Sequence, residues 1–200
     1  MLEIATPEHL PLIAEVLAYG GRSGAWDASL GRRGSQLDAL LAKLRHAFVH
    51  GVLPQVDPRT GAPIETRIAG YVYRVDPSSP PIGFGLFKDF TASAFELWMV
   101  GIAEAHQAKG HGRPMLSELL QTPHGRHVQL ARCGWSSDGS RRCSRVLHSL
   151  GFAMCRATSN EEWLLHNATP PAVVQMIRTM DMTPFEPRRG VGGGAGLQRV

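Results

Sequence analysis

Residues 96–112 read Glu96-Leu97-Trp98-Met99-Val100-Gly101-Ile102-Ala103-Glu104-Ala105-His106-Gln107-Ala108-Lys109-Gly110-His111-Gly112. The apolar first half predicts a buried strand, and the second half is a short loop that leads into a segment with helical spacing. Glycine lacks a Cβ, so the backbone can pass close to a ligand at positions 110 and 112. The amides at the start of a helix carry roughly half a positive charge. The stretch therefore predicts an anion site, and a pyrophosphate is the anion that fits it best.

The chain has 200 residues, of which 43% are hydrophobic and 19% charged. These values predict one globular domain with a sizeable core and exclude extended disorder. We expect residues 1–182 to form the domain and residues 183–200, which are rich in glycine, to be a flexible tail. No stretch has the apolar length of a membrane-spanning helix, and the first residues lack the features of a secretory signal. We therefore expect a cytoplasmic protein without a membrane partner.

Charge and cysteine content narrow the possible ligands. The formal net charge of +4 suits an anionic cofactor and would also suit tRNA. Cys133, Cys143 and Cys155 are odd in number and form no CxxC pair, so neither a disulfide framework nor a zinc site is expected. His106 and His111 lack a carboxylate or thiol at ligand spacing, so no metal site is expected there either.

The pattern of apolar and turn-forming residues predicts the elements. Strands are expected at residues 2–4, 68–75, 82–87, 95–103, 127–133, 152–157 and 162–166, and a further short strand at 52–56 is left open. Helices are expected at residues 7–20, 35–51, 113–120, 140–150 and 169–180. The order β-α-α-β-β-β-α-β-α-β-β predicts a single α/β (α+β) domain with a central, mixed, mostly antiparallel sheet flanked by helices. Three successive strands before the glycine loop exclude a Rossmann fold.

Three features of the chain resemble the GNAT superfamily of acyl-CoA-dependent N-acyltransferases. Residues 107–112 match its pyrophosphate signature of Gln or Arg, two residues, Gly, one residue, and Gly or Ala. An apolar strand ends five residues earlier, at Ile102, as the central strand of the family does. Leu150-Gly151-Phe152 follows an amphipathic helix, as at the end of the next family motif. The resemblance covers residues 68–166 well and the first 50 residues only by element order.

The resemblance implies that acetyl-CoA is a substrate, held by the main chain of this region. Its pyrophosphate would lie against Gln107, Ala108, Lys109, Gly110, His111, Gly112 and Arg113. The central strand would splay at its end, so that the amide of Val100 faces the thioester carbonyl and acts in catalysis. Gly101 and Ile102 would pair with the pantetheine arm, and Ser140 stands where relatives contact that arm.

The resemblance also implies a general base. Glu96 stands six residues before Ile102, where the protein-lysine branch of the family carries a catalytic glutamate. The neighbours Phe95, Leu97 and Trp98 are apolar, which favours proton uptake by a carboxylate. A carboxylate that only hydrogen-bonds to a loop is the alternative.

The proton donor for the leaving thiolate departs from the family pattern. Most relatives place a tyrosine four residues before the glycine of Leu-Gly-Phe, and Leu147 occupies that position here. Ser140 could replace it in part, His148 is adjacent, and water is the remaining source. This departure leaves a weakly catalytic or non-catalytic protein open.

Together these features predict an N-acetyltransferase that moves an acetyl group from acetyl-CoA to a primary amine of a protein or small molecule. The amine would attack directly in a ternary complex with Glu96 as base. Acetylation of aminoacyl-tRNA by a toxin-like relative and a regulatory domain that binds acyl-CoA without catalysis remain alternatives, and a homodimer is left open. The acceptor would meet residues 20–34, which include Arg22, Trp26, Asp27, Arg32 and Arg33. Trp26 would be either a lid over the amine or a core anchor.

Overall fold

The computed structural model describes residues 1–31, 34–57, 60–91, 94–125, 128–134, 137–159 and 161–179. The expected tail at residues 183–200, the acceptor-loop residues Arg32 and Arg33, and the expected element ends at His127 and Met180 lie outside these ranges.

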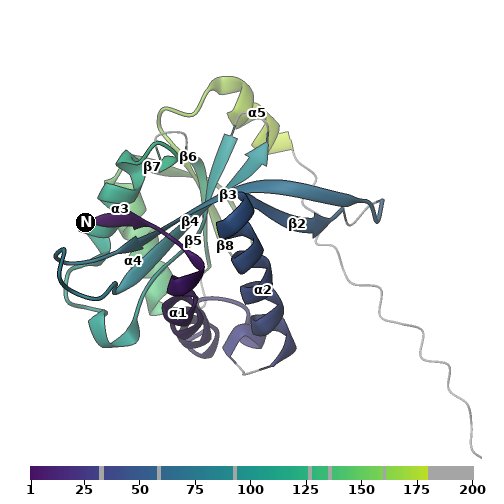
Figure 1. Ribbon diagram of the computed structural model, residues 1–200. Coiled ribbons are helices and arrows are strands. Elements are labelled where there is room, and N and C mark those ends of the chain that lie inside the picture. The colour runs from purple at the N-terminus through teal and green to yellow at the C-terminus, as the bar shows by residue number, and fades with distance from the viewer. Residues whose placement is uncertain are drawn as a thin grey trace, which may run out of the picture.

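One mixed sheet forms the centre of the molecule (Figure 1). Its strand order is β1-β3-β4-β5-β6-β8-β7, and β2 also pairs with β3. The strands are β1 (Leu2–Ile4), β2 (Val52–Val56), β3 (Pro63–Tyr73), β4 (Gly83–Thr91), β5 (Ala94–Ile102), β6 (Val128–Gly134), β7 (Phe152–Ala157) and β8 (Glu161–His166). Among the described strands, β5 and β6 pair in parallel, and the other neighbouring pairs are antiparallel. The expected fold class is confirmed.

Helices cover both faces of the sheet. They are α1 (Leu10–Arg22), α2 (Ser35–His50), α3 (Gly112–Gln121), α4 (Asp138–Ser149) and α5 (Pro171–Thr179). Helices α1 and α2 pack on one face over Val72, Phe84 and Leu86, and α3 and α4 pack on the other. Helix α5 packs over Leu130. Neighbouring strand residues point to opposite faces and Ala131 belongs to the α3–α4 side, so α5 shares the face of α1 and α2.

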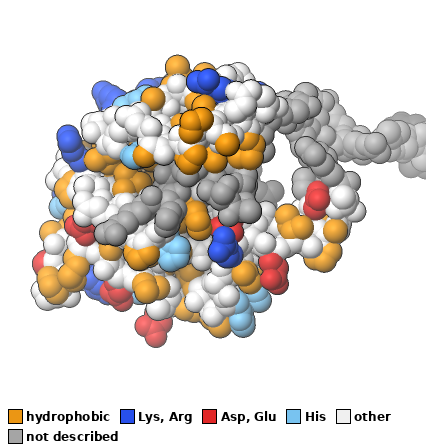
Figure 2. Space-filling view, turned by 90° about the horizontal axis from the view of Figure 1, so that it is seen from above, with side chains coloured by type: hydrophobic (Ala, Val, Ile, Leu, Met, Phe, Trp, Pro, Cys, Tyr) orange, Lys and Arg blue, Asp and Glu red, His pale blue; other side chains and the backbone are white. Residues whose placement is uncertain are grey.

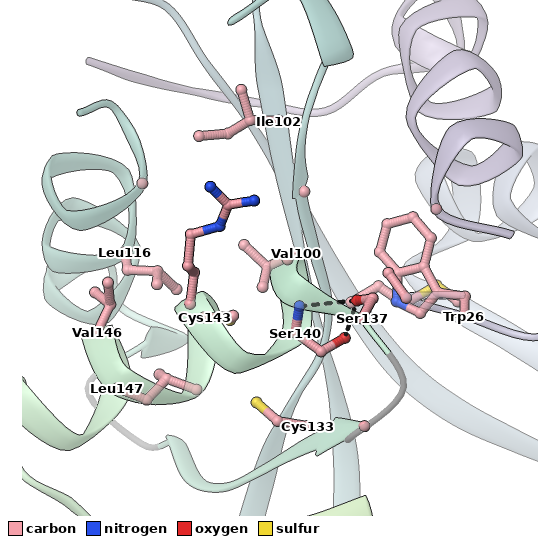
Figure 3. Close-up of a pocket in the computed structure, with 18 of the residues that line it drawn as sticks. Trp26, Val100, Ile102, Leu116, Cys133, Ser137, Ser140, Cys143, Val146 and Leu147 are labelled. Atoms are coloured by element: carbon pink, nitrogen blue, oxygen red, sulfur yellow. Dashed lines mark hydrogen bonds between the residues drawn. The ribbon is translucent and has the colours of Figure 1, made fainter. Parts of the chain in front are cut away.

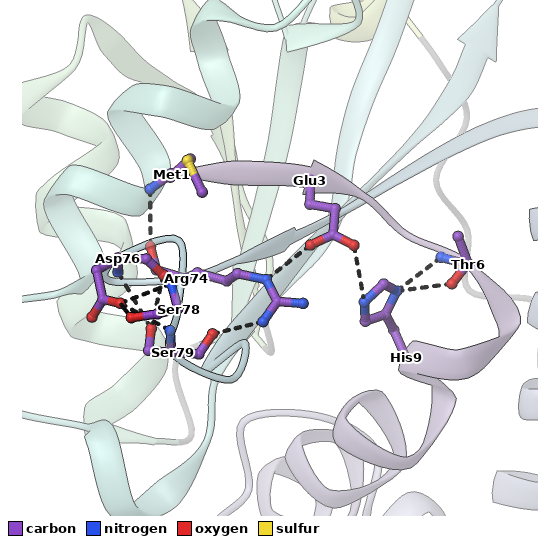
Figure 4. A network of polar contacts seen from close by, with 8 residues as sticks. All are labelled: Met1, Glu3, Thr6, His9, Arg74, Asp76, Ser78 and Ser79. Carbon is purple, nitrogen blue, oxygen red and sulfur yellow. Dashed lines mark hydrogen bonds and ion pairs between the residues drawn. The ribbon is translucent and has the colours of Figure 1, made fainter.

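The N-terminal strand is fixed to the turn after β3 by a polar network (Figure 4). The guanidinium of Arg74 donates to Glu3 over 2.8 Å and to the carbonyl of Ser79 over 2.6 Å. This ion pair holds the pKa of Glu3 below its ordinary value. The amide of Thr6 donates to Nδ1 of His9 over 3.0 Å and closes the turn that begins α1.

Two details differ from the sequence-based prediction. Four successive strands, β2 to β5, lie directly before the glycine loop, because the strand left open at 52–56 is present and forms a hairpin with β3 over the register Val52↔Arg67 to Val56↔Pro63. Strand β3 therefore starts before residue 68, and β4 continues past residue 87 to Thr91. The hairpin arm projects from the body in Figure 1, so its exposed residues carry little of the burial pattern that marks a strand. Within the part of the chain that is described, no helix is both long and apolar enough to cross a bilayer.

Candidate active site

The site lies where the two parallel strands part. Strands β5 and β6 pair only at Phe95↔Val128, Glu96↔Leu130 and Leu97↔Ala131. Beyond this point β5 continues along β4, while β6 continues along β8. The strands therefore diverge and leave a wedge-shaped gap, which confirms the predicted splay of the central strand.

A β-bulge bends β5 at the start of the gap. Leu86 pairs with Met99 and Phe87 pairs with Leu97, so Trp98 has no direct partner on β4. An extra residue of this kind bends its strand and re-aims the following residues. Here it turns the end of β5 away from β6.

The hydrogen-bond alternation decides which main-chain groups face the gap. The amide of Ala103 donates to Ile82 over 2.8 Å, and bonded pairs alternate along an antiparallel ladder. Gly101 consequently bonds to Phe84, and the N–H and C=O of Val100 and Ile102 point toward the gap. The expectation that Gly101 pairs with the pantetheine arm is not supported by this geometry, because its polar groups are directed at β4.

The gap opens into a cavity of about 1160 Å³. The cavity runs from the glycine loop, between α3 and α4, to the end of α1, where Trp26 and Asp27 line it. In Figure 3, Val100 stands near the turn of α4 that carries Cys143 and Ser140, with Leu116, Val146 and Leu147 along one side.

The glycine loop has the geometry of an open cradle. Gly110 has a φ of +86° and Ala108 a φ of +59°, both in the left-handed region. A Cβ placed on Gly110 or Gly112 would meet no heavy atom within 4 Å. The side-chain amide of Gln107 donates to the carbonyl of Ile102 over 2.9 Å. Gln107 therefore ties the loop to the end of β5, where its sequence motif predicts a direct cofactor contact.

The loop and α4 supply cations to the cavity. Ala108, His111 and Arg113 line it together with the loop glycines, whereas Lys109 is exposed and lies outside the lining. Arg142 and Arg145 on α4 also line it. Sequence reasoning missed these two, although their spacing of three residues places them on neighbouring turns of one helix.

Two serines shape the start of α4. The amide of Ser140 donates to the hydroxyl of Ser137 over 3.0 Å, and that hydroxyl donates to the hydroxyl of Ser140 over 3.0 Å. Both residues are buried and line the cavity. Ser137 is the N-cap that sequence reasoning missed, although a serine before an acidic first turn is typical of one. Ser140 keeps its hydroxyl at the cavity wall.

The wall formed by β6 and α4 carries two cysteines. Cys133 and Cys143 are free thiols, and both line the cavity. The hydrogen bond to Cys143, together with burial, raises the pKa of Cys133. The hydrogen bond received from Cys133 lowers the pKa of Cys143, although burial opposes this.

Leu147 stands where most relatives carry a tyrosine, and His148 is next to it. Leu147 is 1% exposed and lines the cavity, so its position supplies no hydroxyl. The ring of His148 lies 3.0 Å from the carbonyl of Phe152 and 3.9 Å from a carboxylate oxygen of Glu162. His148 is therefore directed toward β7 and β8 and is not positioned to protonate a group in the cavity.

Glu96 lines the cavity from β5, in a charged environment. Its side chain is 1% exposed, with Arg132 Nε 2.7 Å from Oε1 and Lys88 Nζ 3.3 Å from Oε2. Oε2 has no hydrogen-bond partner among the described residues, so Lys88 approaches it as a charge. Burial lowers the pKa of Lys88, which Glu96 partly offsets. The apolar environment expected for Glu96 is thus replaced by two cations contributed by β4 and β6.

Trp26 both packs against the core and lines the cavity. A Cβ on Gly101 would lie 2.5 Å from Val16 and 3.0 Å from the Trp26 ring. Glycine at position 101 therefore makes room for α1 and Trp26. Asp27 lies beside Trp26, and hydrogen bonds from Ser29 hold its pKa below the ordinary value.

The described residues contain no group of three or more His, Cys, Asp or Glu side chains placed to hold a metal ion. The rings of His106 and His111 lie 6.4 Å apart between centroids.

No family model matches the chain, and no curated protein is similar to it in sequence. Solved structures do match it. A protein assigned as a phosphinothricin N-acetyltransferase is 14% identical with a TM-score of 0.59, and the match covers 85% of this chain and 99% of that one. YncA from Salmonella typhimurium, assigned as an acetyltransferase and solved with its cofactor acetyl-CoA, is 19% identical with a TM-score of 0.55, over 86% and 98% of the two chains. The ribosomal-protein-alanine N-acetyltransferase of Brucella melitensis is 16% identical with a TM-score of 0.56, over 82% and 97%.

These matches cover 82–86% of this chain and nearly the full length of each solved structure. The chain therefore has the fold of the GNAT superfamily of N-acetyltransferases.

Proposed function

We propose that the protein is an acetyl-CoA-dependent N-acetyltransferase that acts on a primary amine of a protein or small molecule. The observation that carries this proposal is the cavity between the diverging strands, which joins an anion cradle at one end to a buried carboxylate at the other. A reaction between an anionic acyl donor and an amine needs these two ends.

The cofactor end has groups for each part of acetyl-CoA. The pyrophosphate lies against the main chain of residues 107–113, where Arg113 adds positive charge. The pantetheine arm runs along the open edge of β5, near Ile102 and Ser140. The acetyl carbonyl then meets the amide of Val100. One such donor aimed at the developing oxyanion contributes about 10²- to 10³-fold in rate.

Glu96 takes up the proton of the attacking amine, directly or through one water. Its two carboxylate oxygens are paired with Lys88 and Arg132, which hold the side chain in place beside the cavity. Oε2, which lacks a hydrogen-bond partner among the described residues, is the oxygen available for the proton.

The acceptor end favours a cationic amine over a nucleic acid. Asp27 remains ionised beside Trp26 and attracts an ammonium group. Among the described side chains on the face in Figure 2, Lys and Arg are scattered and do not gather into one patch. An RNA partner would require a continuous basic surface.

The experiment that tests the proposal is release of coenzyme A thiol from acetyl-CoA in the presence of panels of small amines, lysine-containing peptides, N-terminal peptides and charged tRNA. We expect thiol release with at least one class of amine, at a rate that rises with the concentrations of amine and of enzyme. Tight acetyl-CoA binding without turnover for any acceptor would instead support the non-catalytic alternative.

A further inference from the structure

The α4 wall of the cavity has one feature that the proposed function leaves unused. Of the three free cysteines, Cys133 and Cys143 both line the cavity. Cys155 lies on β7 outside the lining, and its thiol donates to the carbonyl of Trp163 over 3.4 Å. The two cavity cysteines come from different elements, β6 and α4, which meet at the gap where β5 diverges.

Cleavage of the thioester requires a proton for the departing sulfur of coenzyme A. When an amine displaces coenzyme A, the sulfur leaves as a thiolate whose conjugate acid has a pKa near 8.5. A positioned proton donor accelerates such a step by about 10²- to 10⁴-fold. Leu147 offers no proton, and the hydroxyl of Ser140 accepts a hydrogen bond from the cap residue Ser137. Cys143 lies one helical turn before Leu147, on the same face of α4.

We infer that the Cys143 thiol donates its proton to the sulfur of the departing coenzyme A, and that Cys133 is a positioning residue that stabilises the thiolate left behind. This inference rests on the proposed function. The S–H bond of Cys143 breaks as the S–H bond of coenzyme A forms, while the C–S bond of the thioester breaks and the C–N bond of the amide forms. The proton lost by the amine passes to Glu96 or water, and a proton from solvent restores Cys143. Nothing is oxidised or reduced.

The two thiols are arranged for an acid and its support. Cys133 stays protonated, because the bond to Cys143 and burial both raise its pKa. Its S–H therefore remains available to donate to the sulfur of Cys143, which lowers the pKa of that thiol. An acid works best when its pKa is close to that of the group it protonates, and one thiol that protonates another meets this condition.

Other charges act on Cys143 from each packed element. Glu162 on β8 raises the pKa of Cys143. Arg142 and Arg145 on α4, and Arg113 on α3, line the same cavity.

The test compares Cys143→Ala, Cys143→Ser and Cys133→Ala with Cys155→Ala as the matched control. For the best amine found with wild type, we expect Cys143→Ala and Cys143→Ser to lower kcat by about 100-fold, with acetyl-CoA affinity from titration calorimetry within a factor of three. Because Cys143 must be protonated, kcat of the wild type falls at alkaline pH. This fall of kcat at high pH, the alkaline limb of the pH profile, should disappear in Cys143→Ala and move to higher pH in Cys133→Ala. A purely structural role of the two cysteines would leave the pH profile unchanged. Cys155→Ala should keep both the rate and the limb.

Three results separate the possible failures. If kcat and the alkaline limb of Cys143→Ala match the wild type, the inference is wrong while the proposed function stands. Mass spectrometry of wild type quenched during turnover should find no acetyl group on Cys143, because an acetylated thiol would make it a nucleophile and overturn the role of acid. If wild type turns over no amine, the proposed function fails and the inference fails with it.

Discussion

Gly110 is the residue at which cofactor binding is most easily abolished. Its φ of +86° and the open space around a Cβ place it at the floor of the cradle. We predict that Gly110→Glu removes acetyl-CoA binding, because the side chain enters the cradle and its charge repels the pyrophosphate. Gly61→Glu is the matched control, since Gly61 has a φ of +72° and equally open surroundings in the β2–β3 turn. Titration calorimetry measures both, and unchanged affinity in Gly110→Glu would contradict the position of the cradle.

Replacement of Glu96 should affect both the catalytic rate and the stability of the fold, so the two effects are measured separately. We predict that Glu96→Gln lowers kcat by about 100-fold at neutral pH for a lysine-type amine, whose pKa is near 10.4. The variant should also lose about 1 to 3 kcal/mol of unfolding free energy, because Lys88 and Arg132 lose a buried partner. Steady-state rates and urea unfolding measure the two effects.

Lys88→Gln is the control for Glu96, because it disturbs the same ion pair and keeps the carboxylate. We expect it to lower kcat by less than tenfold. Equal losses in the two variants would mean that Glu96 acts only in positioning. An unaffected Glu96→Gln would favour aminoacyl-tRNA as acceptor, since an α-amino group has a pKa near 8 and needs little base.

At the residue scale, the sequence predicts what is local and misses what the fold brings together. The glycines of the cradle and the glutamate of β5 stand within one continuous stretch, so their chemistry is readable there. The partner Arg132 is 36 residues from Glu96 in the chain and reaches it only because β6 lies beside β5. The contact between Cys133 and Cys143 depends in the same way on α4 crossing β6, so no spacing rule indicates it.

Among the elements, α1 and β5 pack closely together beside the site. A Cβ on Gly101 would lie 2.5 Å from Val16 Cγ1, so we predict that Gly101→Ala costs about 1 to 3 kcal/mol through overpacking. It should also displace Trp26 and raise KM for the amine more than it weakens acetyl-CoA binding. Adding Val16→Ala removes the clashing methyl group. The double variant should therefore be more stable than the sum of the two single changes in urea unfolding, and strict additivity would contradict this packing.

The elements differ in how far their sequence predicts them. Helix α2 ends at Gly51 with a φ of +75°, and a glycine after a periodic apolar face is a readable stop. Strand β3 is harder to delimit, because its first half pairs only with β2 in an exposed arm where sequence alternation is weak. The bulge at Trp98 is also hidden from the sequence, since it is a property of the register between β4 and β5.

For the whole molecule, the site depends on the separation of β5 and β6, which are paired over only a few residues. Beyond residue 97, β5 stays hydrogen-bonded to β4, and β6 stays hydrogen-bonded to β8. Each of the two strands therefore keeps one partner where the sheet divides. The two faces of the sheet are covered by different helical layers, with α3 and α4 on one face and α1 with Trp26 on the other. A ligand seated in the gap would contact both halves and replace the strand pairing that is absent there.

This arrangement predicts that acetyl-CoA stabilises the entire domain and not only its loop. At a concentration 100 times Kd, a ligand that binds only the folded state adds about 2.7 kcal/mol. For a domain of this size we expect Tm to rise by roughly 5 to 10 °C. Differential scanning calorimetry with wild type and Gly110→Glu measures the shift, which the variant should lose. Desulfo-coenzyme A should reproduce most of it, because the cradle and the open strand edge do not contact the acetyl group. A rise confined to acetyl-CoA would place the main binding energy at the thioester and contradict the cradle as the principal anchor.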